Sequence, residues 1–315
     1  MRVLLWLGVT AALVVGVPSS SAAAGRSFPV VIEFWDAQHG LLAESTYASC
    51  SAPVPAERVS LERTSDGGRT WTSVLSVCAS ITGVGGEVTL ATVAPETALL
   101  SVPRGLLVTH DRGRSWSRLT APRIVALSFP SATVGWSVVA GKRTLAVQRT
   151  DDAGRTWKPL SAPCKADDAK LSFVDDAHGW LLCLWNAGAG NQGKAVYETR
   201  DGGTSWQLRA RAPFAVKAVG ELDTYGYPTD VSFRNDGRGW MPQVRGATLA
   251  TRDGGHTWSR LGITEPEVKL GLSVSFVSDA TGFLLLQNGE RRRYELERTD
   301  DGARTWRVVH AWHMP

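Results

Sequence analysis

The chain lacks the features that define several other classes of protein. Only four of its 315 residues are Cys, and no two of them have the Cys-x-x-Cys spacing typical of a zinc site. Lys and Arg number 34 against 30 Asp and Glu, so no strong excess of positive charge indicates nucleic acid as a partner. Beyond residue 24, no segment is apolar enough to span a bilayer. Hydrophobic residues make up 43% of the chain, which is enough to bury a core. This composition excludes a chain that is disordered over its whole length.

Residues 1–24 have the layout of a secretory signal peptide. One Arg precedes an apolar run from Val3 to Val17, and the small residues Ala22–Ala24 follow it. Because this run is shorter than the ~20 residues of a spanning helix, we expect cleavage, with retention as a membrane anchor as the alternative. The mature chain, residues 25–315, would then be secreted or lie in the cell envelope or periplasm.

The four Cys residues are even in number, which in an exported chain favours two disulfides. Proximity favours Cys50–Cys78 and Cys164–Cys183 among the three possible pairings. Each bond would close a short loop and stabilise the fold by roughly 3 kcal/mol. A metal site is the weaker alternative, and we expect neither a metal nor a cofactor.

An eight-residue motif occurs six times along the chain. Its first copy, residues 64–71, is TSDGGRTW, and the consensus is Thr-x-Asp-x-Gly-x-Ser/Thr-Trp. The Trp residues follow one another at intervals of 41–52 residues. The conserved positions of the motif are Asp66, Asp111, Asp152, Asp201, Asp253 and Asp301, and Trp71, Trp116, Trp157, Trp206, Trp258 and Trp306. Such self-similarity indicates a repeat architecture.

A second motif precedes most copies of the first and predicts strands. Residues 171–180, LSFVDDAHGW, are one example, and their Leu-Ser-Phe alternates with the period of two that is typical of a strand. The Asp-Gly-Gly of the eight-residue motif predicts a tight hairpin, in which Gly supplies positive φ and Asp accepts backbone hydrogen bonds. Four strands in each period correspond to one propeller blade, and we expect each motif Trp to pack against a neighbouring blade.

The eight-residue motif resembles the Asp-box, or BNR repeat, of sialidases and sortilin-like ectodomains. Together with the leading segment, it most resembles the photosystem II assembly and stability factor family and its bacterial relatives. The resemblance covers about residues 28–310 and implies an all-β propeller of four-stranded antiparallel blades. Six motif copies predict six blades, and the seven blades usual in the relatives are the alternative. We expect the strand near Phe28–Phe34 to close the ring by pairing with the last blade near Trp306–His310. Ala303 replaces the Gly of the last box, so we expect a less regular turn there.

The resemblance implies two kinds of function. The assembly factors imply a scaffold that binds a protein, whereas the sialidases imply a glycan ligand or glycoside hydrolysis. The Phe/Tyr-Arg-Ile-Pro motif of sialidases is absent, and its nearest match is Pro122-Arg123-Ile124. We therefore expect a monomeric, non-catalytic binding propeller, with a sialidase-like glycoside hydrolase or a lectin-like propeller as the alternatives. The Asp-box side chains are expected to stabilise turns rather than to bind calcium or catalyse.

Three long connections break the repeat, namely residues 43–60, 186–194 and 210–230. Insertions of this kind commonly form the binding surfaces of rigid scaffolds. Residues 186–194 are rich in Gly, and we expect them to be flexible. The longest insertion is our candidate binding loop, and its candidate side chains are Glu221, Asp223, Tyr225 and Tyr227. The two acids would form the carboxylate pair of a hydrolase, and the two tyrosines would contact a glycan. A solvated acid pair and aromatics that pack the loop down are the alternatives.

Overall fold

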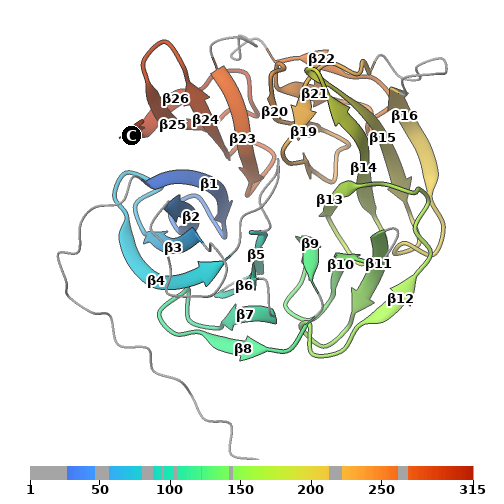
Figure 1. Cartoon of the computed structure of the whole chain (residues 1–315), viewed down its shortest axis with the longest axis horizontal. Helices are drawn as coiled ribbons and strands as arrows, with labels where there is room; N and C mark the ends of the chain where they lie inside the picture. Colours follow the sequence, from blue (N-terminus) through green and yellow to red (C-terminus); the bar gives the residue numbers. More distant parts are fainter. Residues whose placement is uncertain are drawn as a thin grey trace, which may run out of the picture.

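The computed structural model describes residues 27–46, 57–79, 88–93, 96–102, 105–121, 123–141, 145–212, 222–261 and 269–314. Over these residues the regular elements are all β-strands, and no helix that could cross a membrane occurs among them. Six four-stranded antiparallel sheets surround a central axis like the blades of a propeller (Figure 1). The all-β class and the count of six blades are therefore confirmed.

The first three blades follow the chain without interruption. Blade 1 consists of β1 (Ser27–Phe34), β2 (Gly40–Thr46), β3 (Glu57–Thr64) and β4 (Thr72–Ala79). Blade 2 consists of β5 (Leu90–Val93), β6 (Thr97–Val102), β7 (Gly105–Thr109) and β8 (Ser117–Leu119). Blade 3 consists of β9 (Ile124–Ser128), β10 (Gly135–Ala140), β11 (Leu145–Thr150) and β12 (Lys158–Leu160).

The last three blades repeat this order, with one short extra sheet. Blade 4 consists of β13 (Asp168–Phe173), β14 (Gly179–Gly188), β15 (Asn191–Thr199) and β16 (Gln207–Ala212). Blade 5 consists of β18 (Ser232–Phe233), β19 (Gly239–Met241), β21 (Leu249–Thr251) and β22 (Ser259–Arg260). Blade 6 consists of β23 (Lys269–Phe276), β24 (Gly282–Asn288), β25 (Arg293–Thr299) and β26 (Arg307–His313). The extra sheet pairs β17 (Tyr227–Pro228) with β20 (Gln243–Val244) beside blade 5.

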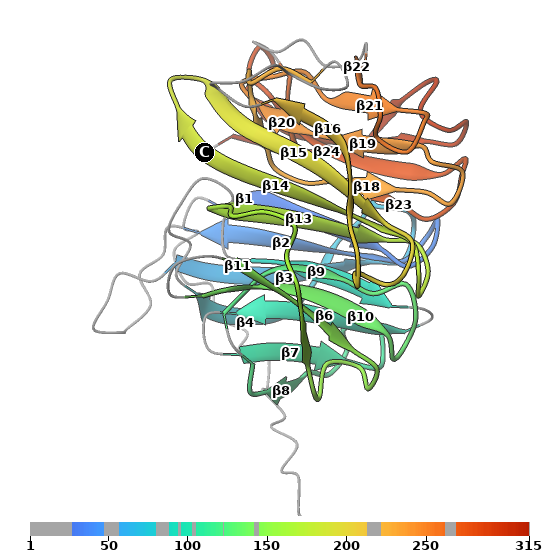
Figure 2. The same ribbon diagram turned by 90° about the vertical axis from the view of Figure 1, so that its right-hand side faces the viewer.

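The antiparallel order gives the ring two different faces. In each blade the first strand lies nearest the axis and the fourth lies outermost (Figures 1 and 2). The turns between strands 1 and 2 and between strands 3 and 4 therefore lie on one face, which we call the box face. The connections between strands 2 and 3 and between successive blades lie on the opposite face. All three long insertions are connections of this second kind, so we call that side the insertion face.

The expected closure of the ring is wrong. Strand β1 pairs with β2, and β26 pairs with β25, so each terminal blade is complete by itself. Blade 1 instead packs beside blade 6, where the amides of Ile32 and Phe34 donate to Ser273 Oγ and Ser275 Oγ at 3.3 and 3.1 Å. Each of the two blades has all four strands without exchange, and hydrogen bonds through side chains together with side-chain packing join them.

A repeated aromatic cluster joins neighbouring blades. Phe173, at the end of β13, stacks on Trp136 of blade 3 at 3.7 Å between ring centroids, and Trp206 meets the Phe173 ring edge-on at 6.1 Å. An added Cβ at Gly179 would lie 2.3 Å from the Phe173 ring, so only Gly leaves room for it. The same arrangement occurs around Phe34, Phe233 and Phe276. The spacing between Phe and Gly-Trp in the leading motif thus encodes the contact between blades.

The Ser of the leading motif joins the innermost strands. The inner edge of each blade exposes backbone amides that no strand pairs with. Ser128 Oγ accepts the amide of Phe173 at 2.8 Å, and Ser172 Oγ accepts that of Phe233 at 2.8 Å. Each Ser therefore satisfies a free amide on the next blade, which accounts for its position directly before the Phe.

Two local expectations have different outcomes. Residues 186–194 form the end of the β14–β15 hairpin, where Asn186, Ala189 and Gly190 adopt the positive φ values of a tight turn, and their flexibility stays a prediction. Cys164 and Cys183 form a disulfide with 6.6 Å between their Cα atoms. Cys50, the partner proposed for Cys78, lies outside the described residues, as does the segment 1–24.

Candidate functional site

The six Asp-box carboxylates accept hydrogen bonds from residues of their own hairpins. In the third box, Asp152 Oδ1 accepts from Thr150 Oγ1 at 2.8 Å, and Asp152 Oδ2 accepts from Thr156 Oγ1 at 2.6 Å. The other five boxes repeat both bonds, at 2.7–2.9 Å and 2.6–2.7 Å. Hydrogen bonds from the hydroxyl and amide of Thr156 lower the pKa of Asp152 to about 2. These acids remain ionised as turn acceptors, and they lie on six separate blades.

The box turns are also tied to the rest of their blades. The amide of Gly67 donates to Gln38 O at 2.9 Å, and an equivalent bond joins the two box-face turns of each other blade. The last box keeps this geometry although Ala303 replaces Gly, because Ala303 adopts φ 68° and its amide still donates to Thr299 Oγ1 at 3.0 Å. The expectation of a less regular turn is therefore wrong.

The candidate binding loop is held against the β14–β15 hairpin. The Tyr227 hydroxyl accepts the amide of Gly190 at 2.7 Å, and Lys194 Nζ donates to Tyr225 O at 2.8 Å. Burial lowers the pKa of Lys194 to about 8. Asp223 Oδ1 accepts the amide of Tyr225 at 3.0 Å. The two insertions thus form one surface over blades 4 and 5, which we call the hairpin platform and which comprises residues 188–192 and 222–228.

The four candidate side chains of the loop have different outcomes. Tyr225 is 42% exposed, Tyr227 is half-buried with its hydroxyl bonded, and Asp223 is exposed on the insertion face. Glu221 lies outside the described residues, so its placement relative to Asp223 remains a prediction. The loop presents one exposed aromatic ring on a backbone that is hydrogen-bonded on two sides.

A cavity that was not expected from the sequence lies on the propeller axis. Its volume is about 700 Å³, and residues from the innermost strand of every blade line it. Apolar side chains such as Leu90, Val125 and Leu272 form much of the wall. A volume of this size falls within the range of small-molecule sites.

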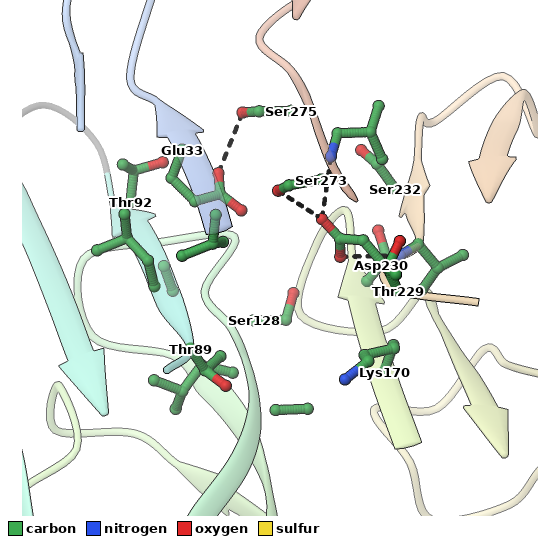
Figure 3. Close-up of a pocket in the computed structure, with 18 of the residues that line it drawn as sticks. Glu33, Thr89, Thr92, Ser128, Lys170, Thr229, Asp230, Ser232, Ser273 and Ser275 are labelled. Carbon is green, nitrogen blue, oxygen red and sulfur yellow. Dashed lines mark hydrogen bonds between the residues drawn. The ribbon is translucent and has the colours of Figure 1, made fainter. Parts of the chain in front are cut away.

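Two carboxyl groups from different blades face this cavity. Glu33, on β1, accepts from Ser275 Oγ at 3.1 Å. Asp230, just before β18, accepts from Ser273 Oγ at 3.0 Å and from the amide of Val274 at 3.1 Å. Figure 3 shows both carboxyl groups, with Ser273 and Ser275 between them. Burial and the charge of Asp230 raise the pKa of Glu33 well above its usual value, and burial likewise raises that of Asp230.

Hydroxyl groups and one Lys complete the polar lining. Thr89, Thr92, Ser128 and Ser232 lie around the wall, and Lys170 of blade 4 lies near Asp230 (Figure 3). Asp230 and Lys170 attract each other, but Lys170 Nζ forms its ion pair with Asp168 at 3.1 Å. Among the described residues, no group of three or more His, Cys, Asp or Glu could hold a metal ion.

The repeat contained a signal for one of these groups. The residue before the conserved Phe is Ser in four blades, and it is Thr92 before Val93 in blade 2. Glu33 occupies this position in blade 1, where it is a carboxyl group in a ring of hydroxyls. An alignment of the six leading segments by their Phe would have found it. Asp230 and Lys170 lie three residues before the Phe, where the other blades have no common residue type, so the repeat offered no comparable signal.

Comparisons with known proteins agree with the repeat. Residues 150–265 match the family model described as photosynthesis system II assembly factor YCF48. The chain is an Asp-box β-propeller similar to the photosystem II assembly factors. This Asp-box propeller is 24% identical over 192 residues to the photosystem II assembly protein Ycf48 of Thermosynechococcus vestitus, a match that covers 61% of this chain and 51% of that protein. The chain thus spans about half the length of this curated relative.

One of two similar solved structures supports the fold of the Asp-box propeller. The α-L-arabinanase of Penicillium chrysogenum, solved with arabinobiose, aligns with a TM-score of 0.54 at 15% identity, over 90% of this chain and 95% of that chain. A structure described as YCF48 bound to D1 peptide aligns with a TM-score of 0.49 at 16% identity, over 90% of this chain and 83% of that chain. At such low identity the arabinanase match concerns the fold alone.

Proposed function

We propose that this Asp-box propeller is an exported, non-catalytic protein that binds a protein partner on its insertion face, in the manner of an assembly factor. The observation that carries the proposal is the match of residues 150–265 to the assembly-factor family. These residues include the whole hairpin platform with its exposed Tyr225. Export follows from the signal peptide expected in residues 1–24.

The hairpin platform has the properties of a protein-binding surface. Its backbone is fixed by bonds from Lys194 and by the bond between Gln192 N and Thr224 O at 2.7 Å, so little conformational entropy would be lost on binding. Tyr225 and Val308 are the large hydrophobic side chains that are most exposed in the described part of the chain, each at 42%. An exposed Tyr on a rigid support is a common anchor of protein interfaces.

A crosslinking pull-down from the envelope fraction of the source cell tests this proposal. The bait is the mature chain, residues 25–315, as the wild type, as Tyr225→Ala and as Val308→Ala. We expect one protein to be recovered in near-equal amounts with the wild type and with Val308→Ala, which removes equal exposure on blade 6. Tyr225→Ala should lower its recovery at least about tenfold, because a central aromatic anchor contributes ~2 kcal/mol or more. Recovery that is equal for all three baits would contradict the proposed surface.

A lectin-like role is the second candidate, and the exposure of Tyr225 beside polar groups favours it. The backbone of Tyr225 pairs with that of Asn191, and Asn191 Oδ1 accepts from Thr224 Oγ1 at 3.1 Å. An exposed ring flanked by amide and hydroxyl groups is suited to a sugar. Glycan-array binding by the wild type that Tyr225→Ala abolishes would favour this role, whereas binding unchanged in that variant would count against it.

A further inference from the structure

The charges that line the central cavity are not balanced. Four charged side chains line it: Glu33, Lys170, Asp230 and Arg234. Lys170 pairs with Asp168 at 3.1 Å, and Arg234 pairs with Asp279 at 3.4 Å. Neither of these acids lines the cavity, so both cations are largely neutralised from outside it.

The two carboxyl groups, in contrast, have only neutral donors. Glu33 receives a hydroxyl of Ser275, and Asp230 receives a hydroxyl of Ser273 and two backbone amides. Within the described part of the chain, no Lys, Arg or His nitrogen lies within 4.0 Å of either carboxyl group. Lys170 attracts Asp230 but forms its ion pair with Asp168, and no ion pair involves Glu33 in the described part of the chain. A buried carboxylate without a paired cation is costly, and a cation placed beside it offsets part of that cost.

The rest of the wall determines what kind of cation fits. Leu90, Val125, Leu127 and Leu272 surround the polar groups, and the cavity holds about 700 Å³. A bare metal ion would leave most of this volume and its apolar wall without a contact. An organic cation places its charge at the carboxyl groups and its apolar body along the wall.

We propose that the central cavity is a binding site for an amphipathic organic cation, whose ammonium or guanidinium group lies between Glu33 and Asp230. The hydroxyls of Thr92, Ser128 and Ser232 also line the cavity, and each has oxygen lone pairs that can accept an N–H group of the ligand. The site lies on the propeller axis, whereas the hairpin platform lies over blades 4 and 5, so this inference does not depend on the proposed protein partner. A free amine and a Lys or Arg side chain of another protein share the required chemistry.

Calorimetric titration of the mature chain with phenethylammonium chloride tests this site. The neutral 2-phenylethanol and the anionic 3-phenylpropionate have similar bodies and serve as matched probes. We expect one phenethylammonium ion to bind per chain, at least about tenfold more tightly than either matched probe. Glu33→Gln and Asp230→Asn should each weaken the binding of phenethylammonium at least about tenfold. The control is Asp151→Asn, which removes an exposed acid of a box hairpin and should leave this binding unchanged. The proposal would be overturned if 2-phenylethanol bound as tightly as phenethylammonium. It would also be overturned if neither Glu33→Gln nor Asp230→Asn weakened the binding of phenethylammonium.

Two further measurements separate binding from folding and distinguish the sources of the cation. Glu33→Gln keeps the shape of the side chain and removes an acid whose pKa is raised by burial, so its thermal midpoint at pH 8 should equal or exceed that of the wild type. Lost binding together with a retained midpoint supports the site, whereas binding retained in that folded variant overturns it. A peptide with one Lys that binds more tightly than its Gln counterpart assigns the site to a protein side chain. Binding of phenethylammonium without such a difference assigns it to a free amine. Binding of CaCl₂ that excludes phenethylammonium would overturn the choice of an organic cation.

Discussion

Gly179 and Phe173 provide the sharpest test of how the blades are joined. The φ of Gly179 is not positive, so its backbone alone would accept Ala, and the loss of glycine's flexibility would stabilise the fold by ~0.4–1 kcal/mol. The added Cβ, however, would lie 2.3 Å from the Phe173 ring. We expect Gly179→Ala to lower the free energy of unfolding by ~1–3 kcal/mol, the usual cost of overpacking.

Removal of the ring should reverse the effect of the added methyl group. Phe173→Ala should cost ~3–5 kcal/mol, because Phe173 is 6% exposed and contacts both Trp136 and Trp206. In that background the clash is absent, so Gly179→Ala should be neutral or stabilising. The double variant should therefore be ~1–4 kcal/mol more stable than the sum of the two single effects.

Urea unfolding followed by Trp fluorescence and circular dichroism measures this coupling. Gly188→Ala is the matched control on the same strand, β14, because no atom lies within 4 Å of its added Cβ. Its effect should add to that of Phe173→Ala within ~0.5 kcal/mol. The effects of Gly179→Ala and Phe173→Ala on the free energy of unfolding could also add within ~0.5 kcal/mol. In that case the Phe173 ring does not require a glycine at position 179, and the packing explanation of the Phe and Gly-Trp spacing is wrong.

Three other perturbations test separate parts of the fold. Asp152→Asn should lower the thermal midpoint measured by calorimetry at neutral pH. Because the pKa of Asp152 is about 2 against an ordinary 3.8, the difference in midpoint between wild type and variant should shrink as pH falls below ~4 and vanish near 2. Burial and a nearby carboxylate raise the pKa of Glu62 to about 7. As pH rises, the Glu62 carboxyl group therefore loses its proton at a lower pH in the unfolded chain than in the folded chain. Glu62→Gln should therefore raise the thermal midpoint increasingly between pH 5 and 7, with a constant gain above pH 7 and none below ~4.5. Replacing Cys164 and Cys183 together with Ser should cost about 3 kcal/mol in urea unfolding, since their bond closes a loop of 19 residues, and a midpoint equal to that of the wild type would contradict a stabilising role.

The fold could be predicted from the sequence because the same interactions between near neighbours in the chain recur in all six repeats. Each box combines a Thr, an Asp and a Ser or Thr whose side chains complete the hairpin within the motif itself. Such contacts lie within seven residues of one another, so their spacing along the chain contains the required information. The closure of the ring was predicted wrongly because it depends on Phe34 and Phe283, which are far apart in the sequence and whose pairing no local pattern specifies.

The candidate site was harder to predict for the same reason. The insertion loop was found by its length, but its support by Lys194 and Gly190 arises only when two insertions fold onto one face. Glu33 and Asp230 are 197 positions apart and belong to blades that are not adjacent.

By itself, the sequence determined the strand periodicity, the six hairpins and the size of each blade, because these depend on interactions between near neighbours in the chain. The tertiary structure alone decided which face carries the insertions, how the first and last blades meet, and which side chains face the axis. A ring brings the innermost strands of all its blades to one centre, and it thereby places two isolated carboxyl groups in a common cavity. Burial then raises the pKa of both groups, a property that neither residue has in the sequence.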